Sequence, residues 1–241
     1  MAKILAFSDL HLNFFSNNGK SILESLYIKD VDVGVCAGDL TTGINNLENA
    51  IIQLCDMYPQ FVYVSGNHEY FGSNFKEIDD MLGNLAAVLP NFHWLNNKRV
   101  SVSGVNFIGA TLWYPPTVAA QINKKHFCDF YCIEKADPEI FDRNAQTIDF
   151  FKKNMCAGDY VISHQMPSRR CIVPKFKGDA FNCFFVNDLD MLILEKEPKI
   201  YLMGHGHTNQ DFTIGPTRLV CNPRGYENEN PMFDPSLIME V

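Results

Sequence analysis

The 241-residue sequence lacks several features that mark special classes of protein. It contains no run of about 18 apolar residues, so a membrane-spanning helix is not expected. The opening residues, MAKILAFSDLHLN, hold a short apolar run that Ser8, Asp9 and His11 interrupt, which is unlike a signal peptide. Low-complexity tracts, internal repeats and linkers rich in glycine, serine or proline are missing. We expect one domain over residues 1–241, located in the cytoplasm.

Clusters of positive charge are also scarce. The formal net charge is −8, and no run of lysine or arginine is longer than Arg169-Arg170. An acidic surface repels nucleic-acid backbones and anionic membranes. The composition therefore disfavours both as partners, although a local basic patch could override the net charge.

The sequence has eight cysteines, but they do not form a recognisable framework. In a chain of this length without a signal peptide, buried free thiols are the better interpretation. Cys128 and Cys132 are four residues apart, which would suit half of a metal site, but no second thiol pair completes it.

Five short runs rich in valine, isoleucine, phenylalanine and tyrosine predict buried strands. Polar residues follow the end of each run. The predicted strands are residues 3–7, 31–37, 61–64, 160–163 and 199–203.

Helix-like periodicity lies between the strands, at residues 21–29, 45–57, 74–88, 138–154 and 188–195, the last with Asn187 as its cap. Two hairpins are expected, one turning at Gly104 and one at Gly215-Pro216. Alternating strands and helices predict a layered α/β fold. The hairpins favour two packed sheets with helices outside.

Polar side chains with metal-binding chemistry are concentrated at the strand ends. In open α/β sheets, ligands bind at the carboxyl ends of strands. The set comprises Asp9, His11, Asp39, Asn67, His68, His164, His205 and His207. The remaining histidines, His93 and His126, lie elsewhere and are interpreted as structural.

The two pairs Asp9/His11 and His205/His207 are expected to point the same way, because residues two apart on an extended segment share a face. Gly206 is expected to let the backbone pass close to a metal. Carboxylate and imidazole ligands suit divalent manganese, iron, cobalt, nickel or zinc. The ligands are too many for one tetrahedral zinc, so two metals sharing a carboxylate fit better. Such a pair of metals can hold the attacking and leaving oxygens of a displacement at phosphorus, and it lowers the pKa of a metal-bound water.

His68 is the exceptional member of the set. If the amide oxygen of Asn67 binds a metal, the imidazole of His68 can face the leaving group of a substrate. An imidazole has an unperturbed pKa near 6.5 and is suited to serve there as a general acid.

These segments resemble the five sequence blocks of the calcineurin-like metallophosphoesterase family, in the family's order. The blocks are Asp9-Leu10-His11, Gly38-Asp39, Gly66-Asn67-His68-Glu69, His164 and Gly204-His205-Gly206-His207. The tail segments 166–169 and 221–226 are similar to those of small bacterial members. The resemblance implies a double β-sandwich of two mixed sheets flanked by helices, in the order α/β/β/α.

The resemblance also implies a site for two divalent metals, with manganese, iron or zinc as candidates. By carry-over, Asp9, His11, Asp39 and His207 would hold the first metal. Asp39, Asn67, His164 and His205 would hold the second, so Asp39 would bridge. Asp39 and His68 would be catalytic, and Asn67 and His68 would contact the phosphate of a small phosphorylated substrate.

Two departures from the pattern narrow the activity. Protein serine/threonine phosphatases of this superfamily usually have glycine after the first histidine and arginine shortly after the bridging aspartate. Here Leu12 and Thr42 occupy those places. Purple acid phosphatases have a metal-bound tyrosine where Thr42 stands. Both activities are therefore disfavoured.

Cationic side chains outside the blocks are candidates for binding a substrate phosphate, and Arg169 and Arg224 are the preferred ones because each follows a strand that leads to the site. The others are Arg143, Arg170, Lys175 and Lys177.

Residues 113–185 are expected to contribute a lid over the site. The sequence does not separate phosphomonoesterase from phosphodiesterase, and it is silent on the oligomeric state. Two alternatives to a phosphoesterase acting on small molecules remain open. One is a catalytically silent scaffold that binds a protein, and the other is a nuclease, which the negative net charge disfavours.

Overall fold

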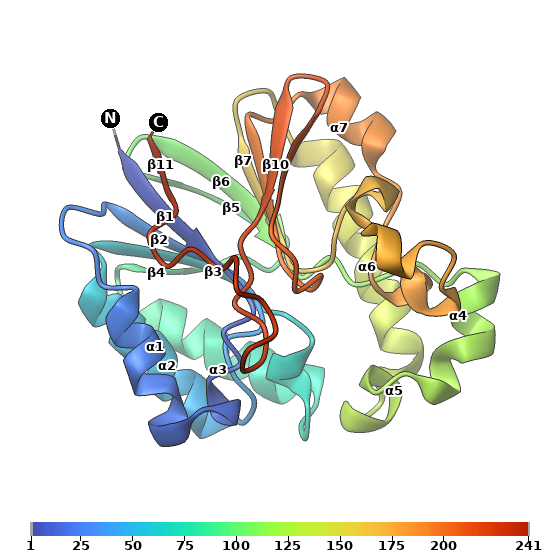
Figure 1. The fold of residues 1–241 in the computed structure, drawn as a ribbon, viewed down its shortest axis with the longest axis horizontal. Helices are drawn as coiled ribbons and strands as arrows, with labels where there is room; N and C mark the ends of the chain where they lie inside the picture. Colours follow the sequence, from blue (N-terminus) through green and yellow to red (C-terminus); the bar gives the residue numbers. More distant parts are fainter. Residues whose placement is uncertain (1, 241) are drawn as a thin grey trace.

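The structure is a computed structural model that describes residues 2–240. Two mixed sheets form its centre, and helices lie outside them (Figure 1). This arrangement confirms the predicted layered α/β fold. Within residues 2–240, no helix is long and apolar enough to cross a membrane.

The first sheet has the strand order β11-β1-β2-β3-β4, and β1 to β4 are parallel. The last strand pairs antiparallel with the first, so the two ends of the chain lie side by side (Figure 1). The strands are β1 (Lys3–Phe7), β2 (Val33–Ala37), β3 (Gln60–Val64), β4 (Phe92–Trp94) and β11 (Ile238–Glu240).

The second sheet has the order β5-β6-β7-β8-β10-β9, with parallel pairing from β6 through β8 to β10 and an antiparallel strand at each edge. Its strands are β5 (Lys98–Val102), β6 (Val105–Ala110), β7 (Tyr160–Ser163), β8 (Ile200–Met203), β9 (Gln210–Ile214) and β10 (Thr217–Cys221).

Side chains alternate between the two faces of each strand, so each sheet contributes to two apolar cores. In β1, Ile4 and Ala6 face the second sheet, where they join Ile162 of β7 in the core between the sheets. Leu5 and Phe7 face outward into a separate cluster with the flanking helices. Because both faces of these strands are buried, successive side chains are apolar and the strands appear in the sequence as continuous apolar runs.

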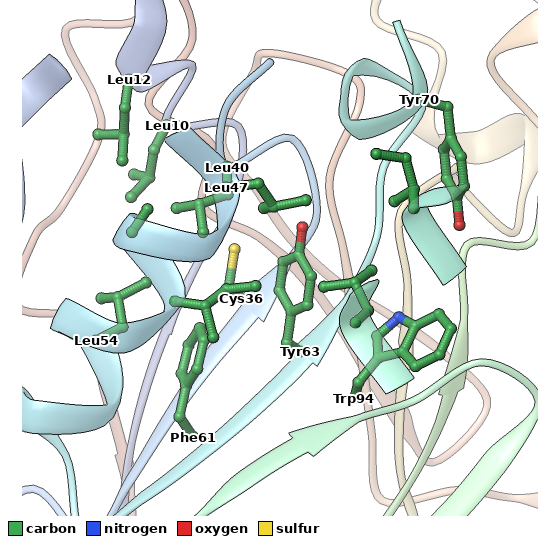
Figure 2. Close-up of a cluster of buried hydrophobic side chains, with 14 of the residues drawn as sticks. Leu10, Leu12, Cys36, Leu40, Leu47, Leu54, Phe61, Tyr63, Tyr70 and Trp94 are labelled. Atoms are coloured by element: carbon green, nitrogen blue, oxygen red, sulfur yellow. The ribbon is translucent and has the colours of Figure 1, made fainter. Parts of the chain in front are cut away.

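Helices α1 (Lys20–Ser25), α2 (Ile44–Met57) and α3 (Phe75–Val88) cover the outer face of the first sheet. The apolar positions of α2 recur every three or four residues and place Leu47 and Leu54 on one face. Figure 2 shows these leucines facing Phe61 and Tyr63 of β3, all fully buried. On the second sheet, α6 (Ala136–Asn154) and α7 (Asp190–Lys196) have the equivalent position.

The predicted elements occur with some changes of boundary. The helix expected at 21–29 ends at Ser25, and the strand expected at 31–37 begins at Val33. Asn187 does not cap α7, which begins at Asp190; the Asn187 side chain instead donates to the carbonyl of Trp113. Strands β4 and β11 were not predicted because three residues are too few to show a periodicity.

The expected lid segment, 113–185, divides between two structural roles. Helix α6 and strand β7 belong to the second sheet and its outer layer. Two further parts of the segment form what we call the aromatic lobe, residues 117–132 and 171–185, which includes α4 (Val118–Asn123) and α5 (Asp129–Cys132). Within the lobe, the rings of Phe127 and Phe184 stack at 4.3 Å. Figure 1 shows α4 and α5 beyond α6, on the far side from α1 and α2.

Candidate metal centre

The carboxyl ends of β1, β2 and β3 meet those of β7 and β8, and the side chains that follow these ends converge. Backbone hydrogen bonds connect the segments: the Asp9 N–H donates to the Gly38 carbonyl at 2.9 Å, and the Gly204 N–H donates to the His164 carbonyl at 3.0 Å. The His205 N–H donates to the Asp9 carboxylate at 3.0 Å, which joins the two sheets at this edge.

Two groups of acidic and imidazole side chains result, and Asp39 belongs to both. The ligand atoms within each group all lie within 4.8 Å of one another. The Asp39 carboxylate is 3.7 Å from His11 Nε2 and 3.3 Å from His164 Nε2. The first group is Asp9, His11, Asp39 and His207, and the second is Asp39, His164 and His205.

Asn67 extends the second group. Its amide oxygen is 3.1 Å from His164 Nε2. The structure thus brings together all seven side chains that the sequence suggested as ligands. His68 lies beside them, with Nε2 4.0 Å from the Asp39 carboxylate.

The polar atoms of these groups are poorly satisfied without a cation. The Nε2 atoms of His11 and His207 are 3.0 Å apart, and Nδ1 of His205 is 3.2 Å from Nε2 of His164. Among the described residues, the buried His205 Nε2 has no hydrogen-bond partner. Buried polar atoms are normally paired. Imidazole nitrogens and carboxylate oxygens in this arrangement fit divalent first-row metals.

The backbone at the ligands is left-handed, contrary to the expectation of extended segments. The φ angles are 52° at Asp9, 46° at His11, 54° at Asp39, 65° at His205 and 42° at His207. Non-glycine residues seldom adopt positive φ, and such strain concentrates at functional sites. The side chains of each Asp-x-His or His-x-His pair therefore converge through tight turns and not through strand alternation.

The expected role of Gly206 beside a metal stays a prediction. A Cβ at this position would meet the Met166 sulfur at 2.8 Å, so the glycine makes room for this methionine. Gly38, Gly204 and Gly66 make room for the ligand side chains, and Gly66 does so most closely. A Cβ there would lie 2.0 Å from a carboxylate oxygen of Asp39.

Glu69 supports these turns, although no role was predicted for it beyond its place in a motif. Its buried carboxylate accepts hydrogen bonds from the N–H groups of Asp39 at 3.1 Å, Leu40 at 2.6 Å and Thr41 at 3.3 Å, and also from Gly66. Burial and the nearby Asp39 charge raise the pKa of Glu69 to about 7. One side chain thereby joins the turns that follow β2 and β3.

The histidines of each group differ in their affinity for a proton. Burial opposes a charge on His164, but the carboxylates of Asp39 and Asp9 outweigh it and raise its pKa to about 9. Burial likewise opposes a charge on His207, whose contacts with Asp9 and Glu229 raise its pKa to about 10. Burial lowers the pKa of His11 to about 4. Without a metal, the His164 and His207 imidazoles therefore favour their protonated forms at neutral pH.

Because a metal needs unprotonated imidazoles, binding should release these protons. We expect the affinity for Mn²⁺ to rise from pH 6 to pH 9, by up to about tenfold per pH unit for each proton released. Titration calorimetry in buffers of different ionisation enthalpy measures the number of protons. Glu229→Gln, which removes a partner 2.7 Å from His207, should release fewer. An affinity independent of pH would contradict the assignment.

A cavity of about 580 Å³ opens beside the two groups, and Asp39, Asn67, His68, His205 and His207 line its inner end. Its outer walls come from the aromatic lobe, together with Tyr226 and Glu229. A larger groove of about 820 Å³ lies at the start of α6 but contains none of the suggested ligands. Volume alone would therefore have pointed to the wrong place.

The preferred arginines are not among the residues that line this cavity. Arg169 is 69% exposed and lies 3.5 Å from Asp188, and the Arg224 guanidinium stacks 3.8 Å from the ring of Phe15. Their binding to a phosphate stays a prediction without support from the geometry. Lys175 and His126 line the cavity instead. His93 bonds to Gln60 at 2.6 Å, in keeping with a structural role.

Tyr226 is a further side chain of the site that had no assigned role. Its ring stacks on His11 at 4.6 Å, and its hydroxyl is 3.5 Å from His68 Nε2. Tyr226 lies five residues after the end of β10, so its position in the sequence does not indicate that it reaches the site.

Residues 2–209 match the family model described as calcineurin-like phosphoesterase, Metallophos. The chain belongs to this family. A relative is the uncharacterized protein L509 of Acanthamoeba polyphaga mimivirus, which is 26% identical over 271 residues, covering 97% of this chain and 95% of that protein.

Solved structures of other calcineurin-like phosphoesterase folds are similar in shape. Phosphopantetheinyl hydrolase (PptH) from Mycobacterium tuberculosis has a TM-score of 0.76 at 16% identity, covering 95% of this chain and 91% of that one. A dimetal phosphatase from Danio rerio has a TM-score of 0.53 at 13% identity, covering 91% and 86%. At such low sequence identity, these similarities concern the fold alone. The family, together with the Asp/His groups, identifies a phosphoesterase chain with a candidate site for divalent metal.

Proposed function

We propose that this protein hydrolyses phosphate esters with two divalent metal ions. The observation that carries the proposal is the presence of Asp39 in both ligand groups, since a shared carboxylate is what a pair of metals a few ångströms apart requires. Asp9, His11 and His207 would complete the first position. Asn67, His164 and His205 would complete the second. Manganese, iron and zinc all suit these donors.

Bound metals would supply Lewis acidity, which activates water and neutralises the charge of the phosphate. The chain's own residues position the ester and move its proton. His68 lies at the inner end of the cavity, where its imidazole can donate to the oxygen of the leaving alcohol. Burial lowers the pKa of His68, and the nearby Asp39 carboxylate acts against that shift. The Tyr226 hydroxyl is placed to orient the ring.

The aromatic lobe is the part of the expected lid that lines the cavity, and we assign it to substrate selection within a single domain. The substrate would be a small phosphorylated molecule that fits the cavity. The overall charge of −8 argues against a nucleic acid as the substrate.

The proposal is tested by elemental analysis of the purified protein together with hydrolysis of p-nitrophenyl phosphate and bis-p-nitrophenyl phosphate in added Mn²⁺. About two metals per chain with turnover would support it. Faster hydrolysis of p-nitrophenyl phosphate would indicate a monoesterase, and faster hydrolysis of the bis compound would indicate a diesterase. No metal and no turnover would favour a silent scaffold that binds a protein.

A further inference from the structure

Apolar side chains make up much of the outer walls of the metal-site cavity. Six of the lining residues carry Phe or Tyr rings: Phe127, Tyr131, Phe176, Phe181, Phe185 and Tyr226. The apolar wall begins at the ligands themselves, because the Phe185 ring is 4.5 Å from the His205 ring. A ligand anchored at the metals would thus contact these rings directly.

Two polar side chains in the same wall are already hydrogen-bonded. The Asp179 carboxylate accepts from the Phe181 N–H at 2.8 Å, and the Asn182 amide donates to the Phe176 carbonyl at 2.8 Å. These two side chains hold the lobe's own backbone, and the Lys175 ammonium lies over the Phe176 ring, 4.7 Å from its centre. Phe176 and Phe181 are nevertheless 47% and 36% exposed. Exposed rings gathered at a cavity mark a surface that a ligand covers.

We propose that this cavity binds the alcohol portion of the substrate and selects a phosphate ester whose alcohol is apolar, such as an arylalkyl or long alkyl group. The inference rests on the proposed function for its phosphate anchor. A volume of about 580 Å³ is in the range of cavities that enclose small organic ligands.

The test uses two phosphonates, which cannot be hydrolysed: 3-phenylpropylphosphonate and propylphosphonate. Their binding to the Mn²⁺-loaded protein is measured by calorimetry. We expect the phenyl compound to bind about 10-fold to 100-fold more tightly, as the burial of a phenyl group predicts. The double variant Phe176→Ala/Phe181→Ala should lose most of that preference. Tyr27→Ala, which removes a more exposed ring of the first-sheet layer, should retain it.

Equal affinities for the two phosphonates, or a preference that survives the double variant, would overturn the proposal. Hydrolysis of phosphate esters is scored separately. Turnover with equal phosphonate affinities would leave the phosphoesterase standing and remove only the apolar pocket. A phenyl preference without turnover would retain the pocket and reject the hydrolase.

A second, independent observation concerns Asp129, which is fully buried in α5 of the aromatic lobe. Its carboxylate accepts from the Asn67 amide at 2.9 Å and from the Tyr114 hydroxyl at 3.0 Å. A carboxylate that accepts from Asn67 fixes the amide nitrogen on its own side. The amide oxygen must then face His164 and the second ligand group.

We infer that Asp129 is a positioning residue, which orients the Asn67 oxygen toward a metal. Partners of this kind commonly change metal affinity by about 10-fold to 100-fold. We expect Asp129→Ala to weaken Mn²⁺ binding by that factor in calorimetry. Asp129→Asn, which retains an acceptor oxygen, should stay within about twofold of wild type.

The double variant with Asn67→Ala tells whether Asp129 acts through Asn67. If it does, Asp129→Ala adds no further loss of affinity in that background. Additive losses would overturn the inference, as would Asp129→Asn binding as weakly as Asp129→Ala. If Asp129→Ala does not fold, Asp129→Leu, which removes the acceptor oxygens and retains most of the side-chain volume, gives the same comparison alone and with Asn67→Ala.

Discussion

His68→Ala is expected to retain both metals and to lose most of its turnover. The imidazole is 14% exposed at the inner end of the cavity and is not a member of either ligand group. General acid catalysis by a positioned side chain contributes about 10²-fold to 10⁴-fold. We expect kcat for 2-phenylethyl phosphate to fall by that factor, while elemental analysis of the variant still gives the metal content of wild type.

The choice of leaving group sharpens this experiment. p-Nitrophenolate leaves readily without a proton, so the loss with p-nitrophenyl phosphate should be much smaller than with the alkyl ester. His93→Ala is the matched control, because that imidazole lies on β4 and bonds to Gln60. An equal loss with both esters would show that His68 is not the acid, and a loss of metal would show that it is a ligand.

Asp39→Asn is expected to bring the metal content below two per chain and to abolish most activity. The Asp39 carboxylate is buried among three histidines, with His164 at 3.3 Å, His11 at 3.7 Å and His68 at 4.0 Å. An amide has one oxygen where the carboxylate has two, so it cannot serve two metals equally. Elemental analysis and titration with Mn²⁺ measure the change.

Asp211→Asn provides the comparison, because Asp211 is an exposed carboxylate paired with Arg218 on the β9–β10 hairpin. It should bind as much metal as wild type. Two metals retained in Asp39→Asn would remove Asp39 as the bridge. Circular dichroism of both variants separates a loss of metal from a loss of fold.

The sequence was sufficient to predict the strands and the residues at their ends because both signals are local. Short apolar runs followed by Asp9, Asp39 or His164 place those side chains at one edge once the strands are parallel. The left-handed turns were not predictable, since Asp-x-His reads equally well as extended chain. The support from Glu69 was missed for a related reason: its four partners lie on two separate turns.

The cavity walls were predicted least well. Arginines after strands suggested a phosphate contact, but Arg224 stacks on Phe15 and Arg169 pairs with Asp188 at the surface. The residues that line the cavity come from irregular segments around Phe127 and Phe181, where no periodicity indicates a direction. These residues converge through packing contacts between segments distant in the sequence, such as that of Phe127 with Phe184, and no local pattern predicts such contacts.

The left-handed backbone at the ligands bears on the stability of the whole protein. Each such residue costs of order 1 kcal/mol in conformational strain, and glycine would relieve it. Five of these positions, Asp9, His11, Asp39, His205 and His207, lie at the candidate metal centre. Glycine at any of them would favour the folded chain while removing a side chain that could hold a metal. The site and the stability of the fold therefore place opposite demands on the same residues.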